Sequence, residues 1–113
     1  MNIRIKRIYD EAEEADNIRI LVDRLWPRGI KKEKANLDLW AKEISPSETL
    51  RKSFNHEIDK YESFKKEYME ELDNNEYAKM FKEKYINEKI TLVYSAKDQK
   101  HNNALVLMEW LNK

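Results

Sequence analysis

The sequence predicts an α/β fold with a small, largely parallel central sheet of about three strands packed by helices on both faces. Two short aliphatic runs, Ile20–Val22 and Ile90–Tyr94, are typical of strands buried on both faces. Several other segments repeat apolar residues at helical spacing. The resulting order is strand, strand, four helical segments, strand and helix, which is an α/β layer arrangement.

The first strand is predicted over Ile3–Tyr9, and its imperfect alternation places it toward an edge of the sheet. The acidic segment Asp10–Asn17 fits a loop or about one turn of helix. This connection is shorter than the dozen or more residues that usually join parallel strands. The direction of the first strand relative to the second therefore stays open.

Helical patterns begin after Gly29. The apolar stripe of Leu37, Trp40, Ala41 and Ile44 predicts a helix capped by Asn36. The run Ser45-Pro46-Ser47-Glu48 is typical of a capping box with Ser45 as the cap. The helix that follows carries Leu50 and Phe54 and is expected to end near Asn55. Further helices are predicted over Ile58–Leu72, Tyr77–Tyr85 and Ala104–Leu111.

Composition bounds the class of protein. We expect one domain over residues 1–113, because 41% hydrophobic residues supply a core. Acidic and basic side chains cancel at 22 each, which argues against coating nucleic acid by bulk charge. The amino terminus lacks the apolar core of a signal peptide, and no apolar run approaches the ~20 residues of a membrane span. We expect a cytoplasmic protein with no membrane partner.

Missing residue types exclude several chemistries. Without cysteine there is no disulfide, thiolate nucleophile or cysteine–zinc site. A single glycine excludes the Walker-type phosphate loop and the dinucleotide fingerprint. Two histidines are too few for a histidine-rich metal cage, and no carboxylates show calcium or zinc spacing. We therefore expect neither a metal nor a cofactor.

Three loops are expected to meet at the carboxyl ends of the strands, where open α/β sheets bind ligands. They are Tyr9–Asp10, Asp23–Gly29 and Ser95–Asn102. Guanidinium groups match phosphate and carboxylate geometry, and a helix is expected to open in the third loop with its free N–H groups. The sequence therefore predicts an anion site, with candidate ligand-binding residues Tyr9, Arg24, Trp26, Arg28, Lys97 and Asn102.

Three residues in these loops are candidate catalytic groups, each with a structural alternative. Asp23 is an acid–base carboxylate or the partner of an internal ion pair with Arg24. Asp98 is an acid–base group or a helix N-cap. His101 is a general base or a hydrogen-bonded structural residue. His56 follows a predicted helix end and is assigned a structural role.

The loop after the second strand also allows nucleic-acid binding. Trp26 is either a stacking platform for a base or sugar, or a hydrophobic plug that fixes the loop. The run Lys31, Lys32 and Lys34 is either a phosphate-binding face or a solvated surface. The plug and the solvated surface are the simpler interpretations.

Several motifs are spread over essentially the whole chain: Leu21-Val22-Asp23-Arg24-Leu25-Trp26-Pro27-Arg28-Gly29, Phe54-Asn55-His56, Tyr94-Ser95-Ala96-Lys97-Asp98 and His101-Asn102-Asn103-Ala104. Together they resemble the YeaO-like family of uncharacterised proteins. The resemblance implies a compact bacterial or archaeal α/β domain with no established substrate. Relatives commonly carry His-Asn-His-Ala at the last motif, so Asn103 is a departure that puts any two-histidine mechanism in doubt.

Four hypotheses remain. The leading one is a domain that binds a phosphate-bearing or other anionic ligand at the strand ends. The alternatives are a hydrolase or transferase acting on a phosphorylated or nucleoside substrate, a nucleic-acid-binding module, and an interaction domain whose dimer interface covers the arginine loop. Whether the chain is an enzyme, and its oligomeric state, are left undecided.

Overall fold

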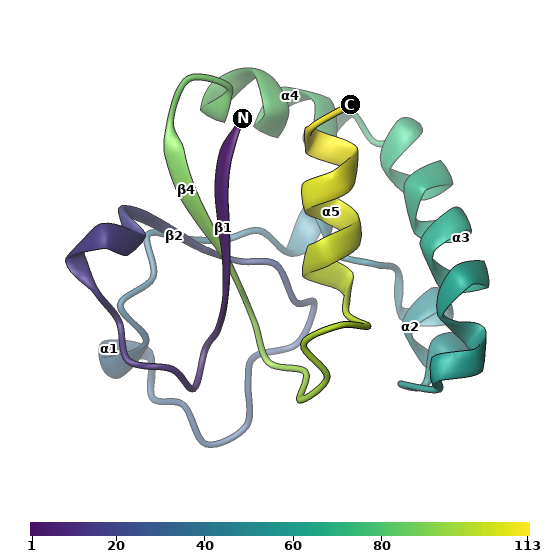
Figure 1. Cartoon of the computed structure of the whole chain (residues 1–113), viewed down its shortest axis with the longest axis horizontal. Helices are drawn as coiled ribbons and strands as arrows, with labels where there is room; N and C mark the ends of the chain where they lie inside the picture. Colours follow the sequence, from purple (N-terminus) through teal and green to yellow (C-terminus); the bar gives the residue numbers. More distant parts are fainter.

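The strands form one parallel four-stranded sheet in a computed structural model that describes residues 1–113 (Figure 1). Its order is β1-β4-β2-β3, and every neighbouring pair is parallel. The strands are β1 (Asn2–Arg7), β2 (Ile18–Leu21), β3 (Leu39–Trp40) and β4 (Lys89–Tyr94). The predicted α/β class with a parallel sheet is therefore confirmed, with one strand more than expected.

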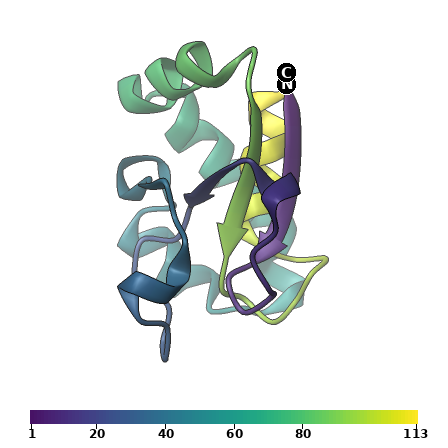
Figure 2. The same ribbon diagram turned by 90° about the vertical axis from the view of Figure 1, so that its left-hand side faces the viewer.

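The first strand lies at the edge of the sheet, as its pattern predicts. β1 and β2 do not pair with each other, and both run parallel to β4, which lies between them. Figure 2 shows the arrows of β1 and β4 side by side and pointing the same way. β1 and β2 therefore run in the same direction, and the short connection between them passes over one intervening strand, β4.

The predicted helix over Leu37–Ile44 is wrong. Leu39 and Trp40 instead form β3 beside β2, and a 3₁₀ turn follows at Lys42–Ile44. The apolar residues of this segment reach opposite faces of the sheet. Leu37 packs with Ile8, Ala35 and Val93, whereas Ala41 and Ile44 enter the main core. The spacing of these apolar residues is the same as that of one face of a helix. In the structure it arises instead from pairing with β2 and from burial in two separate apolar clusters.

Five α-helices accompany the sheet, and three 3₁₀ turns lie at Glu14–Asp16, Lys42–Ile44 and Ile58–Lys60. The helices are α1 (Lys32–Ala35), α2 (Glu48–Phe54), α3 (Tyr61–Asp73), α4 (Glu76–Tyr85) and α5 (Asn103–Leu111). The cap of α2 is Ser47 rather than Ser45, because the Ser47 side chain accepts a hydrogen bond from Leu50 N–H. Ser45 is buried, and its hydroxyl donates to Val22 O and Ala41 O.

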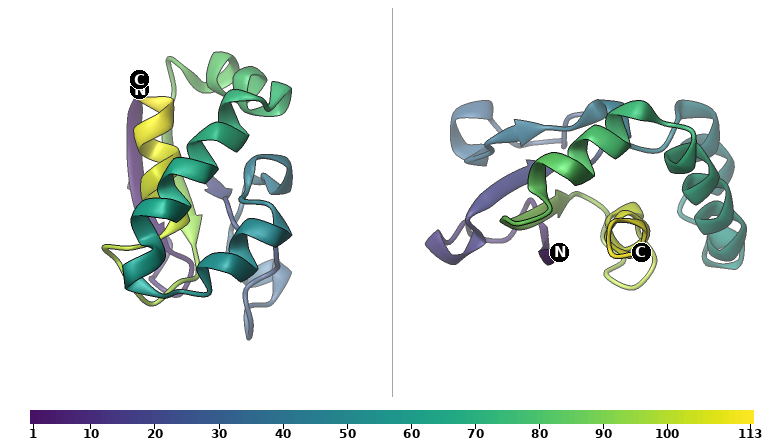
Figure 3. Two further views of the ribbon diagram at one scale, coloured as in Figure 1. Left: turned by 90° about the vertical axis from the view of Figure 1, so that its right-hand side faces the viewer. Right: turned by 90° about the horizontal axis from the view of Figure 1, so that it is seen from above.

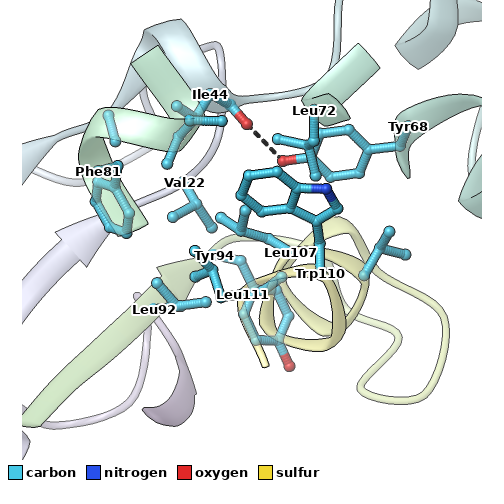
Figure 4. Close-up of a cluster of buried hydrophobic side chains, with 14 of the residues drawn as sticks. Val22, Ile44, Tyr68, Leu72, Phe81, Leu92, Tyr94, Leu107, Trp110 and Leu111 are labelled. Carbon is cyan, nitrogen blue, oxygen red and sulfur yellow. Dashed lines mark hydrogen bonds between the residues drawn. The ribbon is translucent and has the colours of Figure 1, made fainter. Parts of the chain in front are cut away.

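The main core lies between one face of the sheet and helices α2–α5. Alternate residues of β4, Ile90, Leu92 and Tyr94, point into it. The left view of Figure 3 shows α3 crossing in front of α5, with the strands behind. Figure 4 shows the core centred on Trp110 and Leu107, where buried Tyr68 donates to Ile44 O at 2.6 Å. Apolar burial on this face fixes the sheet against the helices.

The opposite face of the sheet is covered by α1, the loop after β2 and the β1–β2 connection. A small apolar cluster of Ile8, Ala35 and Val93 lies there, with Trp26, Ile30 and Leu37 against it. Beside it, buried Asp16 bonds Arg19 at 2.6 Å and Lys6 at 3.2 Å. This face is therefore held partly by an ion-pair network. No helix of the structure combines the length and apolarity that a membrane crossing needs.

Candidate functional site

A cavity of about 380 Å³ opens at the carboxyl ends of the strands, where the sequence places three loops. Its volume falls in the range of small-molecule sites. All three loops contribute to it, together with α2 and its flanks, Phe64 of α3 and the start of α5. Its lining is Tyr9, Asp23, Arg24, Leu25, Trp26, Pro27, Arg28, Pro46, Arg51, Phe54, His56, Phe64, Ser95, Ala96, Asn102 and Asn103.

Asp23 is the single carboxylate in this lining. It lies two residues after the end of β2, and its backbone carbonyl accepts a 2.8 Å hydrogen bond from the Trp40 indole. The carboxylate accepts from the Ser95 hydroxyl at 2.6 Å, Ser95 N–H at 3.0 Å and the Asn103 amide at 3.2 Å. Neutral donors from the residue after β4 and from the start of α5 thus fix the Asp23 side chain.

The expected ion pair between Asp23 and Arg24 is absent, so that interpretation is wrong. Arg24 turns away to donate to Pro46 O at 2.8 Å and to Ser45 O at 3.4 Å. Burial raises the pKa of Asp23 above its usual range, although the Ser95 and Asn103 hydrogen bonds and the charge of His56 pull it down. The Asp23 carboxylate therefore lies in the cavity without a bonded cation.

Three arginines line the same cavity, and none of them forms a salt bridge anywhere in the chain. Arg24 is oriented by two backbone carbonyls, which leaves Nη1 without a protein partner. Arg28 contributes an exposed side chain. Arg51 on α2 has a buried Nε that makes no hydrogen bond. The cavity wall therefore carries several guanidinium groups that form no salt bridge, although Arg24 and Arg51 interact through charge with the exposed carboxylate of Glu48.

The aromatic residues of the β1 and β2 loops are held rigidly. The Tyr9 hydroxyl donates to Arg28 O at 2.9 Å, and the Arg7 guanidinium lies 4.9 Å from the ring centre of Tyr9. The Trp26 indole donates to Ile30 O at 2.6 Å and meets Trp40 edge-on at 5.2 Å. These contacts fit Trp26 as a plug and leave Tyr9, which is 46% exposed, as the aromatic ring at the cavity mouth.

The structure leaves Lys97, Asp98 and His101 outside the cavity lining. Asp98 is not the N-cap of α5, because that helix begins at Asn103 and Asn102 is its cap. Asp98 instead accepts from Lys100 N–H, His101 N–H and the His101 ring at 2.9 Å. These hydrogen bonds hold the pKa of Asp98 below its usual range despite partial burial. Lys97 is exposed.

Asn102 lines the cavity, but both ends of its amide are already bonded. Its oxygen accepts from Leu105 N–H at 3.0 Å, and its nitrogen donates to Asp98 O at 3.0 Å. The expected opening of a helix within Ser95–Asn102 is therefore replaced by a turn stabilised by Asp98. Asn102 thus caps the Leu105 N–H of α5, and the charged donors of the cavity are the guanidinium groups.

Sequence reasoning missed four polar residues of the cavity as site residues: Arg51, His56, Ser95 and Asn103. Arg51 shares one face of α2 with Phe54, three residues on. Asn55 and His56 both have positive φ angles, 47° and 56°, which end α2 and return the chain toward the cavity. The Phe54-Asn55-His56 motif and the departure at Asn103 were the available signals. No group of His, Asp and Glu side chains is clustered for metal binding.

Comparison with known proteins gives the family but no activity. The sequence profile DUF488-N3i, described as the inactive DUF488-N3 subclade, matches residues 2–113. This chain belongs to that subclade. It is 51% identical over 112 residues to the uncharacterised protein YeaO of Escherichia coli, covering 98% of this chain and 97% of YeaO. The expected YeaO-like membership is thus confirmed.

Other relatives align with only part of the chain. An uncharacterised protein of Mycobacterium tuberculosis is 39% identical over 54 residues, which is 48% of this chain and 46% of the relative. No solved structure matches the chain.

Proposed function

We propose that this DUF488-N3i protein binds a phosphate-bearing or other anionic ligand in the cavity at the carboxyl ends of the strands. One observation carries the proposal: Arg24, Arg28 and Arg51 line one cavity, and none is paired with an acid. Guanidinium groups are the side chains best matched to phosphate and carboxylate oxygens. A bound anion would give these three arginines the salt-bridge partner that they lack within the protein.

The arrangement of Arg24 and Arg51 supports a prepared site. Backbone carbonyls fix the Arg24 guanidinium before any ligand arrives, which lowers the entropy that binding must overcome. The buried Nε of Arg51 lacks a partner, and buried polar groups are normally satisfied. An anion beside it would satisfy this donor.

Binding is favoured over hydrolysis or group transfer. Asn103 places a neutral amide against Asp23, and an amide neither accepts nor releases a proton at ordinary pH. His101, the candidate general base, lies outside the cavity lining and is bonded to Asp98. The description of the family as inactive agrees with a role in binding.

Nucleic-acid binding has less support. Trp26 is fixed by its hydrogen bond to Ile30 O and by its edge-on contact with Trp40, which fits a plug better than a stacking platform. The cavity is also bounded on several sides by α2, α5 and the loops, which suits a small molecule.

The proposal is tested by titrating inorganic phosphate and sulfate into the protein by calorimetry and by measuring the melting temperature. We expect binding and a rise in melting temperature that follows mass action. Arg24→Ala and Arg51→Ala should each weaken phosphate binding about tenfold, the loss of one charge-assisted hydrogen bond. Lys66→Ala removes the same charge from an exposed position on α3 and should leave binding unchanged. Absence of binding at millimolar anion would refute the proposal.

A further inference from the structure

The cavity contains more than an anion site needs. A plain phosphate site is best served by cations and N–H donors alone, because a nearby carboxylate repels the anion. Here Asp23 lines the same cavity as the three arginines, yet bonds to none of them. We therefore expect its ligand to present a hydrogen-bond donor to this carboxylate.

The hydrogen bonds of Asp23 leave room for such a group. An ionised carboxylate accepts at about four positions. Ser95 fills two on Oδ2 and Asn103 fills one on Oδ1, so Oδ1 keeps one position without a protein donor. A hydroxyl or amino group of a ligand would occupy it.

The mouth of the cavity adds an aromatic surface. Tyr9 is 46% exposed, and both its hydroxyl and its ring are held, by Arg28 O and by the Arg7 guanidinium. Deeper in the cavity, the lining includes Phe54 and Phe64, which stack with ring centres 4.5 Å apart. A fixed, exposed ring and an apolar wall in the same cavity suit a planar ring of the ligand at little entropic cost.

We propose that the ligand is a phosphomonoester of a planar ring compound that also presents a hydroxyl or amino donor, the chemistry of a 5′-nucleotide. The arginines bind the phosphate, Tyr9 contacts the ring, and Asp23 accepts the hydrogen bond that distinguishes this ligand from inorganic phosphate. This assignment rests on the proposed anion site and names its ligand class.

The test compares inorganic phosphate, ribose 5-phosphate, purine riboside 5′-monophosphate and AMP by calorimetry. We expect AMP to bind at least about tenfold more tightly than phosphate, as one charge-assisted hydrogen bond and one ring contact predict. Asp23→Asn should weaken AMP binding about tenfold while leaving phosphate equal or tighter, since the repelling charge is gone. Asp59→Asn, an exposed aspartate on the 3₁₀ turn Ile58–Lys60, should change neither.

The ring contact is tested with Tyr9→Leu, which should weaken the binding of AMP severalfold and leave the binding of ribose 5-phosphate unchanged. Tyr77→Leu is the matched control, because Tyr77 is 63% exposed on α4 and outside the cavity. If ribose 5-phosphate binds as tightly as AMP, the planar-ring part is overturned. If purine riboside 5′-monophosphate equals AMP, the donor lies on the sugar, and Asp23→Asn must then weaken both.

The two proposals fail in different ways. If phosphate binds but no organic phosphate binds more tightly, the ligand class is wrong and the anion site stands. An equal effect of Asp23→Asn on phosphate and AMP has the same meaning. If none of the four compounds binds, the anion site itself is refuted. The comparison of ligands on the unaltered protein decides the matter even if Asp23→Asn fails to fold.

Discussion

Two aspartates flank β2, and the protein treats them in opposite ways. Asp16 precedes the strand and is buried among Arg4, Lys6 and Arg19, with salt bridges of 3.3, 3.2 and 2.6 Å. Asp23 follows the strand and bonds only neutral donors, although three unpaired arginines line its cavity. One end of the strand neutralises its charges internally, and the other keeps opposite charges apart.

The pKa values of the two aspartates follow this difference. Burial raises the pKa of Asp16, but hydrogen bonds from Glu13 N–H, Arg19 and Lys6 outweigh burial and lower it overall. Burial prevails at Asp23, whose pKa is raised, because its donors carry no charge. Removing one partner of a buried ion pair is strongly destabilising, whereas a carboxylate without bonded cations keeps its charge available to a ligand.

The largest expected effect is on stability at the Asp16 end. Asp16→Asn leaves Arg19 and Lys6 without their counter-charge and should lower the free energy of unfolding by about 3 kcal/mol. Urea unfolding at neutral pH measures it. Asp23→Asn makes the same chemical change at the other end and should shift stability by no more than about 1 kcal/mol. Equal losses in both variants would contradict the distinction between the two ends.

The two aspartates should also respond oppositely to pH. The lowered pKa of Asp16 gives stability that is complete above about pH 4, the usual aspartate pKa, and lost as pH falls through the lowered value. The raised pKa of Asp23 means that stability is lost as pH rises from about 4 through the raised value. The stability of Asp23→Asn relative to the unaltered protein should therefore increase between pH 4 and 7.

Asp16→Asn should show the converse trend, with its deficit shrinking as the solution is acidified below about pH 4. Unfolding curves at pH 3, 4, 5 and 7 separate the two cases. Parallel pH profiles for the two variants would show that the surroundings of the aspartates do not differ as described.

A smaller effect is expected from Ser95→Ala, which removes the 2.6 Å hydroxyl donor and keeps the backbone donor at 3.0 Å. The pKa of Asp23 should rise further, because one hydrogen bond to its charged form is lost. Carboxyl-carbon NMR titration reads this directly. Ser53→Ala, on the exposed side of α2, should leave the Asp23 titration where it is.

The smallest effect is expected at Lys97. The sequence made it a candidate anion ligand, but it lies outside the cavity lining. Lys97→Ala should leave phosphate affinity unchanged within about twofold, whereas Arg24→Ala should not. Calorimetric titration of both variants measures this. A strong loss of phosphate affinity in Lys97→Ala would mean that the anion binds near Lys97, in the loop before α5, and not in the cavity.

The sequence predicted features that depend on local chemistry. The run Ile20–Val22 is fully buried, β1 lies at an edge, and α3, α4 and α5 form close to the positions their apolar spacing indicates. It also brought together the loops that contain Tyr9, Asp23 and Ser95, because parallel strands end at one edge. Hydrophobic periodicity is a pattern of a few neighbouring residues, so a single sequence is enough to predict these features.

Other features depended on partners distant in sequence. Leu39 and Trp40 match a helical stripe, yet β2 offers them a strand position and the two sheet faces divide their neighbours. The partner of Asp23 was expected to be adjacent Arg24, but Ser95 and Asn103 approach from more than seventy residues away. Arg51 joined the cavity only because α2 packs beside the strand ends.

By itself, the sequence determined the α/β class, the family and the edge of the sheet where charged loops gather. Only the tertiary structure decided which charges are neutralised: Asp16 meets Arg4, Lys6 and Arg19, while Asp23 meets none. The physical reason is that apolar periodicity is a property of neighbouring residues, whereas the pairing of a charge depends on distances of a few ångströms between segments that folding brings together.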